Sequence, residues 1–114
     1  MKKFFIFCLF LNLNLSHAQS VYVQGTINCG LWLEARKNNN SIHFEHYILG
    51  FVNGLAVGRV VDIWRENGTQ VSKEQLYYWM DNYCKSNPLK SVVTGAFDFA
   101  NEMTNDEYRK KHPK

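Results

Sequence analysis

Apolar residues recur every three or four positions along most of this 114-residue chain, which is the spacing of one face of an α-helix. The longest such stretch begins after Asn40 or Ser41. Its apolar stripe consists of Phe44, Ile48, Phe51 and Leu55. Gly58 favours a bend or a stop, and we expect the helix to resume through residues 60–64.

Three glycines lie four residues apart on another face of the same predicted helix, at Gly50, Gly54 and Gly58. Each glycine costs a helix about 1 kcal/mol relative to alanine, so three at this spacing require a reason. Small residues let two backbones approach closely, which favours a tightly crossed neighbouring helix. That neighbour is another helix of this chain or a second copy, so the pattern leaves a homo-oligomer open.

A later helix has the clearest start signal in the sequence. Ser72 and Gln75 form the S-x-x-Q pattern of a capping box. The buried stripe predicted for this helix consists of Leu76, Met80, Tyr83 and Cys84. Pro88 cannot continue the helix, and Asn87 is placed to cap the next one.

Two shorter helices complete the pattern, and Thr26 or Asn28 is placed to cap the first of them. Its apolar side consists of Cys29, Trp32 and Leu33, with Arg36 at the same spacing. The last helix has Val92, Ala96, Phe99, Ala100 and Met103 at helical spacing. Residues 19–27 lean toward an extended arm, 67–68 form a turn, and no strand pair is expected. The sequence predicts an all-α fold, a small bundle of four to five helices.

The N-terminus has the three-part pattern of a cleavable secretory signal. Lys2 and Lys3 precede an apolar stretch over residues 4–15, and residues 16–18 (SHA) place small side chains where signal peptidase cuts. A membrane anchor needs about 20 apolar residues, more than this stretch supplies. We expect cleavage after Ala18 and one periplasmic or secreted domain over residues 19–114, with no membrane attachment and a flexible tail from about residue 105.

Removal of the signal changes the charge of the chain. The full sequence has 13 basic and 10 acidic residues, a net charge of +3. Without Lys2 and Lys3, eleven basic residues remain against ten acidic ones, a net charge of about +1. A near-neutral domain lacks the basic surface that is typical of nucleic-acid binding, so nucleic acid is not expected as a partner.

The cysteine count becomes even in the same step. Cys8 leaves with the signal, while Cys29 and Cys84 remain. An even pair in an oxidising compartment is typical of a disulfide. The alternatives are a metal pair, which would require closer spacing, and a catalytic thiol. We predict a Cys29–Cys84 bridge, which would stabilise the fold by about 4 kcal/mol.

Residues with a recognisable catalytic or metal-binding pattern are few. His43, Glu45 and His46 lie within one helical turn, but the sequence offers no distinctive further ligand for a metal. The chain has no nucleophile elbow, no H-E-x-x-H motif and no glycine loop of the phosphate-binding kind. We expect no metal, no cofactor and no enzymatic activity.

The aromatic residues point most clearly to binding. Tyr77, Tyr78 and Trp79 are consecutive, span about 200° of a helix and cannot all face one core, so we expect Tyr78 to point outward. Tyrosine and tryptophan are enriched at protein interfaces. The candidate partner-binding residues are Tyr77, Tyr78, Trp79 and Trp64. Two alternatives stay open, in which the 66–70 loop or the N-terminal arm covers these rings, or the rings stack on carbohydrate.

Three segments resemble an uncharacterised family of small exported bacterial proteins. They are Cys29-Gly30-x-Trp32, Leu49-Gly50-Phe51-x-x-Gly54-Leu55-Ala56 and Trp79-Met80-Asp81-Asn82-Tyr83-Cys84-x-x-Asn87-Pro88-Leu89. The pattern is also distantly similar to the Rap/Tai-type periplasmic immunity proteins, which block toxins delivered by type VI secretion, and to the HdeA-type acid-stress chaperones. Rap/Tai-type proteins often have further cysteines, which this chain lacks. The resemblance implies a bridged helical domain without catalytic residues.

The leading hypothesis is a non-catalytic periplasmic binding protein that covers another protein, as an immunity or inhibitor protein against a toxin or cell-wall hydrolase. The first alternative is an HdeA-type periplasmic chaperone, which would expose apolar surface when its carboxylates are protonated in acid. The second alternative is an envelope enzyme of unknown type.

Overall fold

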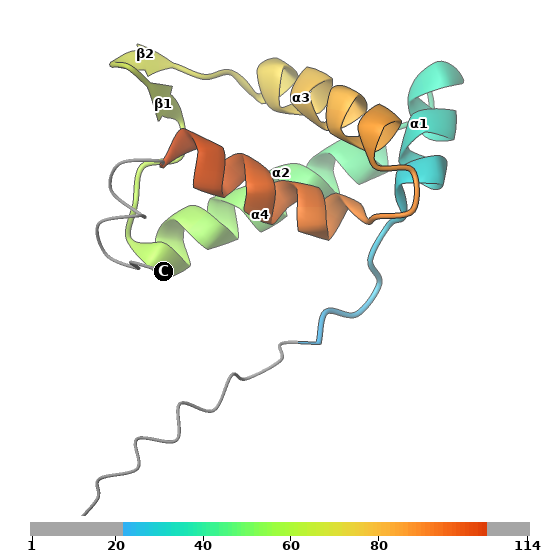
Figure 1. Ribbon diagram of the computed structural model, residues 1–114, viewed down its shortest axis with the longest axis horizontal. Coiled ribbons are helices and arrows are strands. Elements are labelled where there is room, and N and C mark those ends of the chain that lie inside the picture. Colours follow the sequence, from blue (N-terminus) through green and yellow to red (C-terminus); the bar gives the residue numbers. More distant parts are fainter. Residues whose placement is uncertain (1–21, 105–114) are drawn as a thin grey trace, which may run out of the picture.

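The structure, a computed structural model, describes residues 22–104, which form four helices and one small hairpin (Figure 1). In chain order the elements are α1 (Cys29–Lys37), α2 (Ile42–Arg59), β1 (Arg65–Glu66), β2 (Thr69–Gln70), α3 (Lys73–Ser86) and α4 (Val92–Met103). The predicted helical fold is confirmed for these residues. The predicted signal, its cleavage site after Ala18 and the tail from residue 105 lie outside the described residues.

One antiparallel pair of two-residue strands breaks the all-α pattern. Arg65 pairs with Gln70, and Glu66 pairs with Thr69. Asn67 and Gly68 join the strands with φ angles of 50° and 80°, the left-handed conformation that tight two-residue hairpins require. The expectation of no strand pair was therefore wrong, because strands this short carry no alternating pattern that the sequence could display.

Two helices begin at side chains that the sequence predicts as N-terminal caps. The Asn28 side chain accepts a hydrogen bond from the Leu31 amide at 2.8 Å, so Asn28 rather than Thr26 begins α1. Both hydrogen bonds of the predicted capping box are present at the start of α3, between Ser72 and Gln75.

The boundary between α3 and α4 differs from the prediction. Ser91, not Asn87, caps α4, and its hydroxyl accepts from the Thr94 amide at 3.3 Å. Asn87 instead closes α3, because its side-chain amide donates to the Tyr83 carbonyl at 2.9 Å. Residues 87–90 thus form a turn between the two helices.

The longest helix, α2, ends at Arg59 and does not resume. Val60 follows in the left-handed conformation, with a φ angle of 54°. Beyond it Val61 and Ile63 are buried while Asp62 is exposed, which is the alternation of extended chain rather than of a helix. The expected continuation through residues 60–64 is therefore wrong.

The core lies between α3 and the other helices. Helix α4 packs between α2 and α3, and α1 packs against α3 near its C-terminal end (Figure 1). The largest fully buried side chains are those of Trp32, Phe99, Ile48, Ile63, Leu76 and Met80. Helices α3 and α4 pack tightly at Gly95 of α4, where a Cβ atom would lie 2.7 Å from Met80 Sδ.

The glycine stripe of α2 is not a packing face within the described chain. Gly50, Gly54 and Gly58 are exposed, and a Cβ atom at any of them would meet nothing within 4 Å. The expected close contact with a neighbouring helix of the same chain is therefore wrong. Contact of this face with a second copy stays a prediction.

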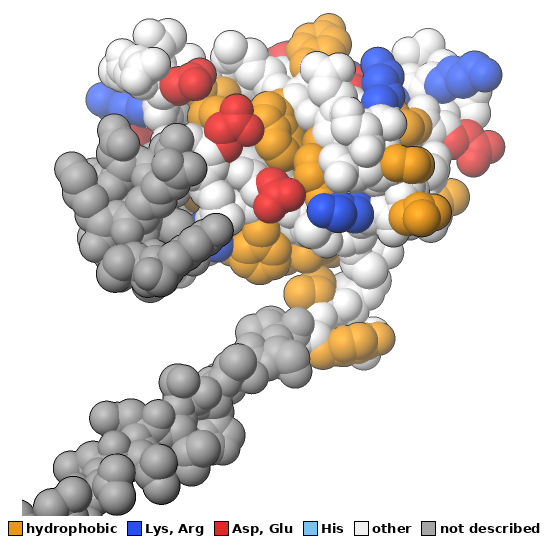
Figure 2. Space-filling model, viewed as in Figure 1, with side chains coloured by type: hydrophobic (Ala, Val, Ile, Leu, Met, Phe, Trp, Pro, Cys, Tyr) orange, Lys and Arg blue, Asp and Glu red, His pale blue; other side chains and the backbone are white. Residues whose placement is uncertain are grey.

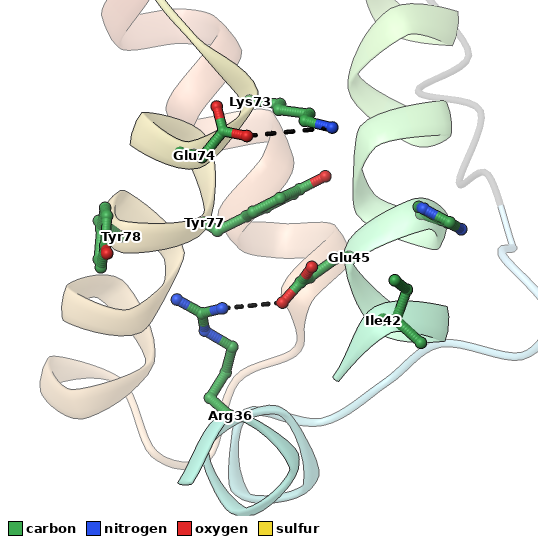
Figure 3. A pocket seen from close by; sticks show the side chains of 8 residues that line it. Arg36, Ile42, Glu45, Lys73, Glu74, Tyr77 and Tyr78 are labelled. Atoms are coloured by element: carbon green, nitrogen blue, oxygen red, sulfur yellow. Dashed lines mark hydrogen bonds and ion pairs between the residues drawn. The ribbon is translucent and has the colours of Figure 1, made fainter. Parts of the chain in front are cut away.

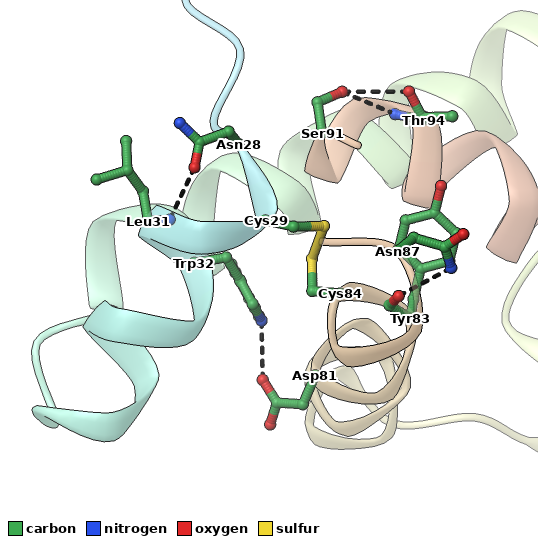
Figure 4. Close-up of a disulfide and its surroundings, with 10 residues drawn as sticks. All are labelled: Asn28, Cys29, Leu31, Trp32, Asp81, Tyr83, Cys84, Asn87, Ser91 and Thr94. Carbon is green, nitrogen blue, oxygen red and sulfur yellow. Dashed lines mark hydrogen bonds between the residues drawn. A yellow bond between two sulfur atoms is a disulfide. The ribbon is translucent and has the colours of Figure 1, made fainter. Parts of the chain in front are cut away.

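The predicted Cys29–Cys84 disulfide is confirmed (Figure 4). Both cysteines are fully buried, and their Cα atoms lie 4.9 Å apart. The bond joins the first turn of α1 to the last turns of α3. A backbone hydrogen bond of 2.9 Å from the Cys29 amide to the Lys90 carbonyl ties the same end of α1 to the turn before α4. No helix within residues 22–104 has both the length and the apolar content needed to cross a membrane.

Candidate functional site

The four aromatic residues singled out as partner-binding candidates do not form one surface. Tyr78 of α3 is 65 % exposed, whereas the adjacent Tyr77 is only 6 % exposed and its ring lies 6.4 Å from that of Trp32. The expectation that Tyr78 points outward is confirmed. Tyr77 instead forms part of the core at the junction of α1 and α3.

The two candidate tryptophans belong to a separate cluster around Phe99. The ring centroids of Trp64 and Trp79 lie 6.3 Å and 5.3 Å from that of Phe99. Both are partly buried and both donate their indole N–H, Trp64 to Asn53 at 2.8 Å and Trp79 to Glu102 at 2.9 Å. These two rings are therefore held by packing and hydrogen bonds, and Tyr78 is the most accessible of the four.

Arg36 of α1 organises the surroundings of Tyr78 through a two-point contact with Asp81 of α3. Arg36 Nε donates to Asp81 Oδ1 and Arg36 Nη2 donates to Asp81 Oδ2, each at 2.9 Å. The same Oδ1 atom accepts the indole N–H of the fully buried Trp32 at 2.8 Å (Figure 4). Forked contacts of this kind fix orientation as well as distance.

A second carboxylate connects Arg36 to α2. Arg36 Nη1 donates to Glu45 Oε1 at 2.8 Å, and the hydroxyl of the buried Ser41 donates to the same oxygen at 2.7 Å. The hydrogen bond with Asp81 is the main reason that the pKa of Arg36 is raised above its ordinary value. One guanidinium therefore joins three helices: α1, α2 and α3.

The guanidinium also contacts aromatic rings. Its central carbon lies 5.7 Å from the centroid of the Tyr78 ring and 5.8 Å from that of Trp32. Both distances fall in the range of cation–π attraction. Tyr78 is consequently an exposed ring that rests against a side chain fixed by two carboxylates.

A pocket of about 220 Å³ opens beside Tyr78, between α2 and α3 (Figure 3). Its lining residues are Arg36, Ile42, Glu45, His46, Lys73, Glu74, Tyr77 and Tyr78. The Tyr77 side chain and the Glu45 carboxylate point into the space between the two helices (Figure 3). Burial is the main reason that the pKa of Tyr77 is raised above its ordinary value, and the charges of Glu45 and Glu74 raise it further. The Tyr77 hydroxyl can donate a hydrogen bond into this space.

The residues considered for a metal site do not converge. His43 and His46 are both exposed on α2, and Glu45 is engaged by Arg36 and Ser41. Within residues 22–104 no group of three or more histidine, cysteine or carboxylate side chains is placed to hold a metal ion.

Other large apolar side chains reach the surface away from this pocket. They include Leu31, Val57, Val60 and Leu89. Figure 2 shows apolar side chains at several separate places on one face, between acidic and basic ones. The feature that distinguishes Tyr78 from these residues is the fixed guanidinium behind its ring.

Comparison with models of known protein families, with characterised proteins and with solved structures finds no match. The resemblance to small exported bacterial proteins stays a prediction.

Proposed function

We propose that this chain is an exported, non-catalytic binding protein that acts by covering another protein, with Tyr78 at the centre of the contact surface. The observation that carries the proposal is the combination of exposure and fixation at this residue. Tyr78 is 65 % exposed, yet its ring lies 5.7 Å from a guanidinium that Asp81 and Glu45 hold in place.

Fixation matters because binding loses free energy when a side chain must be ordered. An ordered, rotamer-rich side chain costs about 0.5–1.5 kcal/mol at an interface, and a ring that is already ordered avoids that loss. Tyrosine and arginine are also among the residues that contribute most to protein interfaces. Tyr78 and Arg36 together therefore resemble a preformed anchor for a partner protein.

Export is the second part of the proposal. The buried Cys29–Cys84 disulfide accords with folding in an oxidising compartment, as the predicted signal requires. A toxin or a cell-wall hydrolase in that compartment is the kind of partner that an immunity or inhibitor protein would cover. N-terminal sequencing of the exported protein should find Gln19 as the first residue if the signal is cleaved as predicted.

An acid-stress chaperone is the second candidate, and the Arg36 contacts favour it. The ion pairs of Arg36 with Asp81 and Glu45 join α1, α2 and α3, and ion pairs of this kind are weakened in strong acid. The domain would then be expected to open and expose apolar surface. Aggregation of a client protein in strong acid, measured by light scattering with and without this protein, tests the idea, and unchanged aggregation would reject it.

The binding proposal is tested by photo-crosslinking in the native host. A photoreactive phenylalanine analogue at position 78 should give one crosslinked species of defined mass, identified by mass spectrometry. The same analogue at Leu89, a fully exposed apolar position, is the control and should not yield that species. Equal crosslinking from both positions, or none from position 78, would contradict the proposal.

A further inference from the structure

The pocket beside Tyr78 has acceptor and donor groups that the fold does not use. Glu45 Oε1 accepts hydrogen bonds from Arg36 and Ser41, but no residue of the described chain is bonded to Glu45 Oε2. The Glu45 side chain is only 19 % exposed, so most of this carboxylate is shielded from solvent. A partly buried carboxylate oxygen without a donor is a favourable acceptor for a cationic group.

The Tyr77 hydroxyl supplies a second polar atom in the same space. Its side chain extends from α3 toward α2, above the Glu45 carboxylate (Figure 3). The hydroxyl oxygen can also accept a hydrogen bond. Two carboxylates, Glu45 and Glu74, oppose ionisation of this hydroxyl more strongly than Arg36 favours it. These charges therefore disfavour a further negative charge beside the hydroxyl.

The charged side chains around the pocket are paired with one another. The lining contains two carboxylates, Glu45 and Glu74, and two cations, Arg36 and Lys73, while Asp81 lies outside the lining and is bound to Arg36. The charge of Arg36 is already matched by two carboxylates. Lys73 and Glu74 form a loose pair of 3.9 Å at the mouth, where both side chains are more than half exposed. An exposed pair of this kind is weak and exchanges readily with another cation.

The N-termini of α2 and α3 place partial positive charge near the pocket, but nearby carboxylates compensate it. The first turns of α2 and α3 border the pocket, and helix N-termini carry partial positive charge. Each of these turns contains one carboxylate, Glu45 in α2 and Glu74 in α3. Those carboxylates compensate the helix dipoles, so the dipoles do not make the pocket a site for anions.

We propose that the pocket between α2 and α3 receives a basic side chain, lysine or arginine, of the partner protein that packs on Tyr78. The cation lies between Glu45 Oε2, the Tyr77 hydroxyl and Glu74, and its aliphatic stem contacts Ile42. A volume of about 220 Å³ accommodates a group of this size, since one water molecule needs only about 10–15 Å³ of the same measure. This inference rests on the proposed function, because it identifies the chemistry of the partner's contact residue.

The test uses the disulfide-bonded protein recovered from the periplasm and four small probes. Acetyl-lysine amide and acetyl-arginine amide are the basic probes, and acetyl-glutamine amide and acetyl-glutamate amide are the neutral and acidic controls. Each is titrated while backbone amide signals are followed by NMR. The basic probes should shift the signals of residues 42–46 and 73–78, with a lower dissociation constant than either control.

Charge variants make the test specific to the pocket. Glu74→Gln should weaken binding of the basic probes by about two- to fivefold, the effect of one exposed ion pair. Lys73→Gln should strengthen it by a similar factor, because a competing cation is removed. Glu66→Gln changes an exposed carboxylate of β1, outside the pocket, and should leave binding unchanged.

The inference is wrong if the neutral or acidic probe binds as well as the basic ones, if no probe shifts the pocket signals, or if Glu74→Gln and Glu66→Gln have equal effects. If Glu74→Gln does not fold, the tighter binding of the basic probes expected for Lys73→Gln still tests the inference. A partner crosslinked at position 78 without a preference for basic probes would preserve the proposed function and reject this inference. Probe binding without a crosslinked partner would support a cation-binding pocket but reject the proposed function, and with it the assignment of the cation to a partner protein.

Discussion

Asp81→Ala is expected to lower the free energy of unfolding by about 2–3 kcal/mol. Asp81 binds two nitrogens of Arg36 and accepts the indole N–H of Trp32. Removing one partner of a fully buried ion pair costs about 3–5 kcal/mol, and removing one from an exposed pair costs about 0.2–1 kcal/mol. The Asp81 and Arg36 side chains are 14 % and 24 % exposed, which places the pair nearer the buried case.

Two features of the structure adjust that value in opposite directions. Trp32 is fully buried, so its N–H would lose its acceptor, a loss of about 1–3 kcal/mol. Glu45 would still neutralise part of the charge of Arg36, which limits the destabilisation. The disulfide keeps α1 beside α3, so the variant should lose these contacts without detaching the helix.

Urea denaturation followed by circular dichroism measures the change. Glu74→Ala is the matched control on the same helix, because its ion pair is long and exposed, and it should cost about 1 kcal/mol or less. Arg36→Met and the double variant complete a double-mutant cycle with Asp81→Ala. The reasoning is refuted if Asp81→Ala costs no more than Glu74→Ala, or if the cycle shows no coupling between Arg36 and Asp81.

Three further predictions concern stability. Reduction of the disulfide should lower the free energy of unfolding by about 4 kcal/mol, measured by denaturation with and without reductant, and an equal stability of both forms would contradict the chain-entropy estimate. Gly54→Ala should stabilise the protein by up to about 1 kcal/mol because the added Cβ meets open space, whereas Gly95→Ala should destabilise it because the Cβ would lie 2.7 Å from Met80 Sδ. Thermal unfolding of both variants measures the difference, and equal changes in melting temperature would refute it. Burial raises the pKa of Tyr77 above its ordinary value of 10.0, so the unfolded chain loses this proton at a lower pH than the folded protein. The contribution of Tyr77 to the free energy of unfolding should therefore be fully present below about pH 10 and decline above it. Tyr77→Phe should flatten that decline in denaturation measured across alkaline pH, and an unchanged slope would reject the role of this hydroxyl.

The helices and the disulfide could be predicted because their signals are local or compositional. The capping box at Ser72 and Gln75 lies within four residues, and Pro88 stops α3 by the geometry of its own ring. The end of α2 at Arg59 does not follow from the sequence, because the apolar residues Val61 and Ile63 suit a helix as well as an extended chain. Their spacing of two residues was the one sign of extended chain.

The site could be predicted only in part. Tyr78 followed from three consecutive aromatic residues on one helix, because a helix cannot bury all of them. The Arg36–Asp81 contact did not follow, since 45 residues separate its members and either charge alone is typical of a solvated helix face. The one local signal was the position of Arg36 at the same spacing as Cys29 and Trp32, on the apolar side of α1.

The spacing of glycines in the sequence does not show which of them lie at a contact between helices. Gly95 is an isolated glycine that weakens the pattern of α4, yet a Cβ atom at this position would collide with Met80 and Tyr83 of α3. The regular series at Gly50 and Gly54 faces open space. A helix that retains such residues on its exposed side gives up stability there, and contact with a second copy would recover it.

Under the proposed function, stability and binding are linked through one side chain. Arg36 is fixed by contacts that join three helices, and the same guanidinium supports the exposed ring of Tyr78. A variant at Arg36 or Asp81 would therefore weaken binding by loosening the anchor, even while the domain stays folded. Tyr78→Ala removes the anchor and leaves those contacts intact, so its effect on binding exceeds its effect on unfolding. The ratio of the effect on binding to the effect on unfolding is therefore expected to be larger for Tyr78, which contacts the partner, than for Arg36 and Asp81, which hold Tyr78 in place.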